Sequence, residues 1–155
     1  MKKKYILIAL CMMALCAGVV LVLQTSLKDD ETPKDLEYRT ERDAFVNNLQ
    51  NLPDFTECYW KAAATGNTRF GPTNYWIRGF VCLDENTFQK IIGEYDWIPV
   101  SVSFPDGISP SITGRNDFDW SGSKAYETTI LQQNFVGNIY LDTTNGILYL
   151  DVENA

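Results

Sequence analysis

A long apolar run follows three lysines at the start of the chain. After Lys2, Lys3 and Lys4, the nineteen residues from Tyr5 to Leu23 contain no charged side chain. A helix of this length spans about 28 Å, close to the ~30 Å hydrocarbon core of a bilayer. The run exceeds the roughly 7–15 apolar residues of a signal peptide, and no small-x-small cleavage site follows it. We therefore predict a membrane anchor or signal segment over residues 1–27.

The pattern changes twice after this segment. Residues 28–34 are polar and contain a proline, which predicts a flexible tether. A helix is predicted over residues 35–51, because Pro53 prevents it from continuing. Its apolar positions recur at spacings of seven, four and three, on one stripe: Tyr38, Phe45, Leu49 and Leu52.

The middle of the chain predicts two strands and a second helix. Strands are expected over residues 55–64 and 74–83, and the second is apolar on both faces, as in a central strand. Asp84 suits the N-cap of a helix over residues 85–94, where apolar side chains recur at helical spacing. An extended segment over residues 97–100 follows this helix.

The C-terminus carries the clearest β-hairpin pattern. Asn145-Gly146 is a preferred pair for a two-residue type I′ turn between strands 138–144 and 147–152. Leu141 then faces Leu150, and a longer four-residue turn would shift the partners yet keep the same residues on each face.

These elements predict an α+β fold for residues 35–155. We expect a small antiparallel sheet of four to five strands with two helices packed on one side. The Ser-, Pro-, Gly- and Asp-rich stretch of residues 101–124 is predicted as a long loop, either functional or poorly ordered.

Charge and composition restrict the compartment and the chemistry. The lysines before the apolar run predict that the N-terminus stays inside and the domain lies outside the cell membrane, or is secreted if the segment is cleaved. From Lys28 onward the chain has 10 basic and 20 acidic residues, a net charge of −10, so we expect no nucleic-acid partner. The absence of histidine excludes imidazole catalysis and histidine-bound zinc. No cofactor is expected.

The exported part contains two cysteines, Cys58 and Cys82. If strands 55–64 and 74–83 pair so that Trp60 faces Phe80, the two cysteines face each other at about 4.5 Å between Cα atoms. An oxidising compartment would allow a disulfide there. The alternative is a pair of reduced, buried thiols.

Two motifs suggest ligand chemistry. Asp117, Asp119 and Ser121 match the first three ligand positions of a calcium loop, but its twelfth position is Thr128, so the candidate is weak and no metal is expected. The single Ser-x-x-Lys motif, Ser121 to Lys124, lies in the predicted loop without a strand and helix to present it.

Five residues are candidates for binding. Arg78 interrupts an apolar strand, where we expect an ion pair or a cation–π stack on Trp60 or Trp76 rather than a ligand. Phe118 and Trp120 have polar neighbours, so we expect them to be exposed and able to anchor a partner. Tyr140 and Tyr149 share one face of the predicted hairpin.

No catalytic set of residues emerges, so an enzyme is not expected. The leading hypothesis is a membrane-anchored extracytoplasmic module that binds another envelope or extracellular protein, as an inhibitor, immunity factor or envelope accessory subunit. The alternative is a domain for cell-wall glycan or another small ligand, with Trp120, Tyr140 and Tyr149 as stacking surfaces. A hydrolase using paired carboxylates is a third hypothesis, although no spacing singles out a pair.

Overall fold

The computed structural model describes residues 36–49, 51–65, 74–131 and 134–154. The predicted anchor and tether lie outside these residues, and no helix within them is long and apolar enough to span a membrane. The described helices and strands, in chain order, are α2 (Arg42–Asn48), β1 (Phe55–Thr65), β2 (Asn74–Leu83), α3 (Glu85–Glu94), β3 (Ile98–Pro99), the 3₁₀ turn η1 (Pro110–Thr113), β4 (Trp120–Gly122), α4 (Lys124–Ile130), β5 (Phe135–Asp142) and β6 (Ile147–Asn154).

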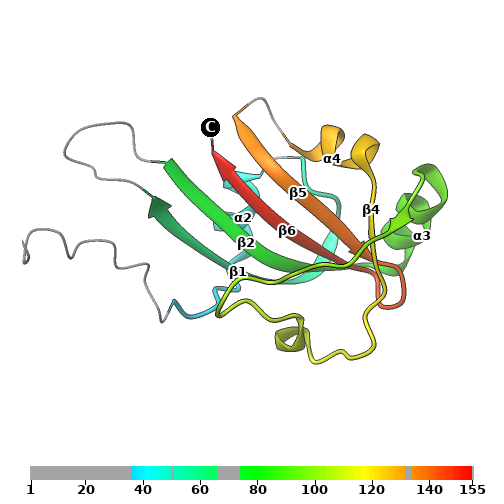
Figure 1. The fold of residues 1–155 in the computed structure, drawn as a ribbon, viewed down its shortest axis with the longest axis horizontal. Coiled ribbons are helices and arrows are strands. Elements are labelled where there is room, and N and C mark those ends of the chain that lie inside the picture. The colour runs from blue at the N-terminus through cyan, green and yellow to red at the C-terminus, as the bar shows by residue number, and fades with distance from the viewer. Residues whose placement is uncertain (1–35, 50, 66–73, 132–133, 155) are drawn as a thin grey trace, which may run out of the picture. The chain divides into compact units, whose positions relative to one another are not determined.

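One antiparallel sheet organises these elements (Figure 1). Its strand order is β1-β2-β6-β5-β4-β3, and every neighbouring pair is antiparallel. The predicted α+β class is therefore confirmed. The described part has six strands and three α-helices, more than the sequence predicted, because β3, β4 and α4 are too short for a clear periodic pattern.

All three helices bury their apolar residues against the same side of the sheet, which we call the helix face. The core on this side combines strand residues such as Trp60, Ile77 and Leu150 with Phe45 of α2 and Ile91 of α3. Tyr126 and Ile130 of α4 belong to the same core.

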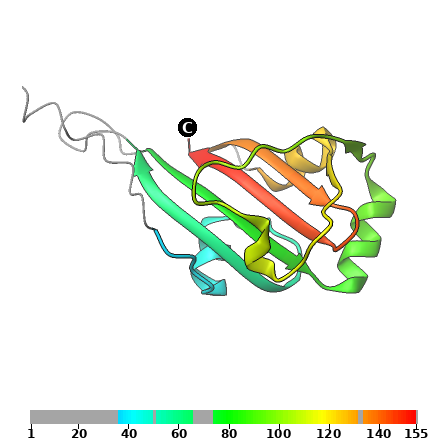
Figure 2. The same cartoon turned by 60° about the horizontal axis from the view of Figure 1, so that its bottom comes forward.

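The opposite side, which we call the loop face, is covered over part of its area by the chain between β3 and β4. Figure 2 shows this segment, with η1, in front of the strands and α2 behind them. Phe104 and Ile108 from the segment pack with Phe80, Tyr149 and Trp120 in a second buried cluster. The predicted 101–124 loop is thus a cover for the sheet, and it also contains η1 and β4.

The first helix is shorter than predicted. It begins at Arg42, because Arg39 is extended and forms a β-bridge with Trp60 at the outer edge of β1 (N···O 2.8 and 2.9 Å). Phe45 lies on the helix face as expected, whereas Tyr38 lies on the loop face, so the predicted stripe was wrong at that end. The Tyr38 hydroxyl accepts a hydrogen bond from the Ser109 amide (2.8 Å).

The C-terminal hairpin has the longer of the two turns considered. Asp142 pairs with Ile147, so the turn contains four residues, and Leu141 faces Leu148 instead of Leu150. The prediction of which residues share a face is confirmed, because both registers have the same parity. Gly146 ends the turn with a positive φ of 66°, which favours glycine.

Candidate protein-binding surface

The five candidate binding residues come together on the loop face. Arg78 lies on β2, Tyr149 on β6, Tyr140 on β5 and Trp120 on β4, and Phe118 precedes β4 by two residues. Directly paired residues of neighbouring strands share a face, which aligns Tyr140 with Tyr149 across the sheet.

Four of these residues form a continuous series of ring contacts. Phe118 stacks on Trp120 (centroids 5.7 Å apart), Trp120 contacts Tyr149 edge-on (6.2 Å), and Tyr149 stacks on Tyr140 (6.0 Å). Burial falls towards both ends of the series, since Phe118 and Tyr140 are half-buried.

Trp120 is buried, and the prediction that it is exposed was wrong. It is 9% exposed, because β4 pairs with β5 and the indole packs against Phe80 and Phe104 of the second cluster. Polar neighbours in the sequence do not show that a residue is exposed here, because Ser121, the next residue of β4, is buried too.

Tyr149 is the most deeply buried ring of this series. Its side chain is 1% exposed and, among the described residues, its hydroxyl has no hydrogen-bond partner. Burial raises the pKa of the Tyr149 phenol, as it does less strongly for Tyr140, so both rings are neutral at physiological pH.

Arg78 has two partners within the sheet. Its Nε donates to Asp151 Oδ1 at 2.7 Å, and its guanidinium lies 4.7 Å from the centroid of the Trp76 ring. The expected ion pair and cation–π stack are both present. Arg78 therefore has a structural role on the part of the loop face that the covering segment leaves open.

Apolar side chains are exposed where the sheet continues beyond Tyr140. Tyr140 pairs with Gly122 of β4, and Gly122 pairs with Ile98 of β3. Ile98 is 67% exposed and the neighbouring Val100 is 38% exposed. We call this area the Gly122 patch, and its residues are Ile98, Val100, Phe118, Gly122 and Tyr140.

Gly122 leaves a slot at the centre of the patch. A Cβ built on Gly122 would lie 3.8 Å from Val100 Cγ1 and 3.9 Å from Tyr140 Cδ1, which are ordinary van der Waals distances. The two side chains thus form walls on either side of a position without a side chain of its own.

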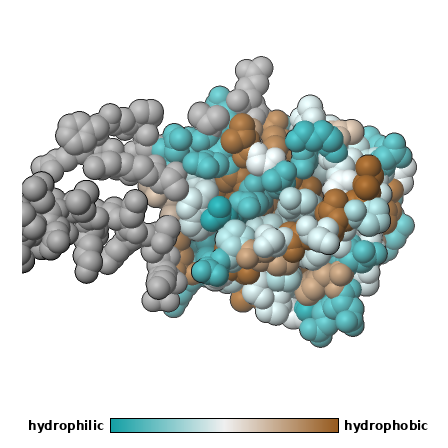
Figure 3. Space-filling view, in the orientation of Figure 1, coloured by the Kyte–Doolittle hydropathy of each residue, from teal (hydrophilic) through white to brown (hydrophobic). Residues whose placement is uncertain are grey.

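The outer edge of β3 is poorly suited to pairing with another strand. Val100 donates its amide inward to the Trp120 carbonyl (2.9 Å), so the amide at position 99 would point outward, and Pro99 has none. Recognition at the Gly122 patch would therefore depend on side chains. Figure 3 shows hydrophobic residues distributed among hydrophilic ones on the side in view, without one large apolar area.

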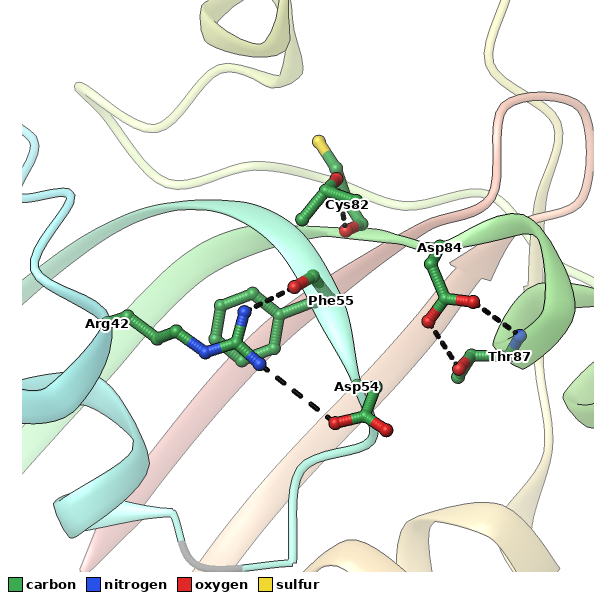
Figure 4. A network of polar contacts seen from close by, with 7 residues as sticks. Arg42, Asp54, Phe55, Cys82, Asp84 and Thr87 are labelled. Carbon is green, nitrogen blue, oxygen red and sulfur yellow. Dashed lines mark hydrogen bonds and ion pairs between the residues drawn. The ribbon is translucent and has the colours of Figure 1, made fainter.

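The predicted disulfide does not form. β1 pairs with β2 in a register that sets Glu57, not Cys58, opposite Cys82, and both thiols are free. A shift of one residue turns a side chain to the other face, so Cys58 lies in the helix-face core and Cys82 packs on the loop face. In Figure 4 the Cys82 sulfur points away from Arg42, which lies over the Phe55 ring.

The buried carboxylates have structural partners. Asp142 is fully buried in the hairpin turn and accepts hydrogen bonds from the amides of Asp119 (2.7 Å), Thr144 and Asn145 (both 3.2 Å). These bonds hold the four-residue turn against the start of β4, and Asn145 Nδ2 adds a fourth at 2.7 Å.

Glu127 of α4 is also buried. Its Oε1 accepts from the Ile139 amide (3.3 Å) and its Oε2 pairs with Lys124 Nζ (2.5 Å). Its carboxylate therefore occupies the edge of β5 beyond the end of β4.

The calcium-loop residues do not converge. Asp117 is exposed with a positive φ of 56°, Asp119 precedes β4, and Ser121 is buried within it. Across the described ranges, no three His, Cys, Asp or Glu side chains form a group that could hold a metal ion.

Two open hollows lined by described residues lie on the helix side of the sheet. The larger, about 370 Å³, contains Asp43 and the pair of Arg42 with Asp54 (4.0 Å). The smaller, about 250 Å³, is lined by residues that include Trp60 and Tyr75. Neither includes any of the predicted binding residues.

No family model, curated protein or solved structure matches this chain significantly. Function must therefore be argued from the site itself.

Three members of the patch were not among the predicted site residues: Ile98, Val100 and Gly122. The extended segment 97–100 was a usable signal, because two aliphatic residues alternate there with a proline typical of edge strands. The position of Gly122 between them and Tyr140 follows only from the pairing of β3, β4 and β5.

Proposed function

We propose that the protein is a membrane-tethered, extracytoplasmic module that binds another protein through the Gly122 patch. The observation that carries this proposal is the exposure of Ile98 and Val100 on the same face of the sheet as the half-buried ring of Tyr140. Aliphatic and aromatic side chains grouped over buried aromatic residues are typical of the energetic centre of a protein interface. The anchor predicted from Tyr5 to Leu23 would hold the module at the outer side of the membrane.

The alternatives have less support. Glycan stacking needs accessible ring faces, but Trp120 and Tyr149 are buried and Tyr140 stacks on Tyr149. A carboxylate-based hydrolase needs two acids facing one cleft. Asp142 is instead buried in a turn and Asp151 is paired with Arg78.

The test compares two single substitutions in the full-length, tagged protein in its native membrane. Ile98→Asp places a charge in the patch. Val136→Asp is the matched control, because Val136 is a β-branched residue of β5 that is 55% exposed and lies on the same face, outside the patch. Cells are crosslinked, the protein is recovered from solubilised membranes, and the crosslinked partner is quantified by mass spectrometry.

We expect a discrete partner whose recovery falls at least about tenfold with Ile98→Asp, because the substitution removes the apolar contact of Ile98 and desolvates a carboxylate in its place, which together oppose binding by more than about 1.4 kcal/mol. The Val136→Asp protein should recover the partner normally. Equal recovery by the two variants, or recovery of no partner by the unsubstituted protein, would contradict the proposed function.

A further inference from the structure

The slot over Gly122 has the width of a single aliphatic group. Its walls are Val100 Cγ1 and Tyr140 Cδ1, which a Cβ on Gly122 would meet at 3.8 and 3.9 Å. Ile98 and Tyr140 are the direct cross-strand neighbours of Gly122 on either side. A partner side chain entering here would replace the missing one and contact both walls.

Three acidic residues lie close to patch residues along the chain, and the one lysine as near in sequence, Lys124, is paired with Glu127. Asp96 precedes Ile98 by two residues, and Asp117 and Asp119 flank Phe118 in the sequence. All three are exposed, and none forms an ion pair with a lysine or arginine of the described residues. Together with the net charge of −10 from Lys28 onward, they favour a basic partner over an acidic one and over anionic lipid.

The same charge disfavours a second copy of this chain. Two identical patches facing each other would bring six unpaired carboxylates into one interface.

Resting on the proposed function, we infer that the partner is a protein that inserts one aliphatic side chain, flanked by lysine or arginine, into the slot over Gly122. Apolar burial in the slot supplies affinity, and the carboxylates around it select the basic flanks.

The experiment uses the full-length chain with Ser101→p-benzoylphenylalanine, because Ser101 is exposed next to Val100 and its replacement leaves both walls of the slot intact. Crosslink yield in native cells is measured with Gly122, Gly122→Ala and Gly122→Leu. Alanine fits without a clash and leucine fills the slot further, and circular dichroism checks that each variant keeps the sheet. We expect Gly122→Leu to lower the yield about tenfold or more, the loss expected when one aliphatic side chain is excluded from its site, with Gly122→Ala intermediate. If the leucine variant does not fold, the crosslink yield of the alanine variant alone tests the inference.

The charge requirement is tested in the same cells with the triple variant Asp96→Asn, Asp117→Asn and Asp119→Asn. Its matched control removes three exposed charges elsewhere: Glu37→Gln, Glu41→Gln and Asp43→Asn. We expect a several-fold loss of yield for the patch variant alone, and a crosslinked peptide with Lys or Arg within a few residues of an aliphatic side chain.

Unchanged yield with Gly122→Leu, or a crosslinked peptide with acidic flanks, would overturn this inference. If Ile98→Asp still abolishes partner recovery in that case, the proposed function stands and only the slot is excluded. If Ile98→Asp has no effect on partner recovery either, both the slot and the proposed function are excluded.

Discussion

Strands β1 and β2 approach each other closely at Gly79. Gly79 of β2 pairs with Trp60 of β1, and a Cβ at this position would lie 2.6 Å from the Tyr59 carbonyl oxygen, 2.7 Å from Trp60 Cβ and 2.8 Å from Trp60 Cα. These are backbone atoms and the first atom of a buried side chain, so none can move without displacing β1. We therefore expect Gly79→Ala to destabilise the fold.

The magnitude follows from two opposing contributions. Overpacking costs about 1–3 kcal/mol. Because the added Cβ would contact backbone atoms, we expect the cost at Gly79 to be about 3 kcal/mol. The reduced freedom of the unfolded chain offsets about 0.4–1 kcal/mol. The expected loss of unfolding free energy is therefore about 2 kcal/mol, or a urea midpoint about 1 M lower for a slope of about 2 kcal/mol per M.

Gly93→Ala is the matched control. Gly93 lies near the end of α3, where a Cβ would meet no atom within 4 Å. The same substitution should there stabilise the protein by about 0.5 kcal/mol, because alanine is the better helix former.

The assay is urea unfolding of the full chain in mild detergent, followed by tryptophan fluorescence. All four tryptophans, at positions 60, 76, 97 and 120, lie in the sheet domain, so the anchor does not contribute to the signal. Equal midpoints for Gly79→Ala and the unsubstituted protein would refute the reasoning, as would a shift of the same sign for both alanine variants.

Three further predictions concern Asp142 and the two cysteines. Asp142→Asn should cost about 2–3 kcal/mol in the same urea titration, because an amide NH₂ would face the donors of Asp119 and Asn145; a cost below about 1 kcal/mol would contradict this. Mass spectrometry of the non-reduced protein should find free thiols at Cys58 and Cys82, and a bridge between them would show that the β1–β2 register is wrong. Burial, with the nearby Glu57 charge, raises the pKa of the Cys82 thiol to about 11, above its usual 9.0, so iodoacetamide should modify it more slowly in the folded than in the unfolded protein around pH 9. Because the raised pKa favours the protonated thiol in the folded state, its contribution to stability is present below the unfolded pKa and is lost as pH rises towards 11.

Elements specified by local signals were predictable. α3 matches its predicted bounds of 85–94, because Asp84 caps it. Its carboxylate accepts from the Thr87 hydroxyl (2.5 Å) and from the Thr87 amide (3.1 Å), and these two bonds lower the pKa of Asp84. β2 also matches residues 74–83, and apolar residues on both of its faces belong to buried clusters, although on the loop face only Phe80 is fully buried.

The binding surface was predictable in part. Alternation along a strand placed Tyr140 and Tyr149 on one face of the hairpin, and Arg78 with Phe80 on one face of β2. Whether these two faces are the same side of the sheet depends on the pairing of β2 with β6, which no local pattern encodes.

The chain by itself determined the longer elements, α3, β2 and the C-terminal hairpin, and which residues of each of these strands share a face, because these depend on neighbours a few positions away. Tertiary structure decided the register between β1 and β2, the burial of Trp120 and the place of Gly122 between Val100 and Tyr140. Side chains alternate with a period of two, so a shift of one residue, accompanied here by an irregularity between Phe55 and Glu57, was enough to move the two cysteines to opposite faces. Contacts between distant segments select one such register from several that local propensity leaves equivalent.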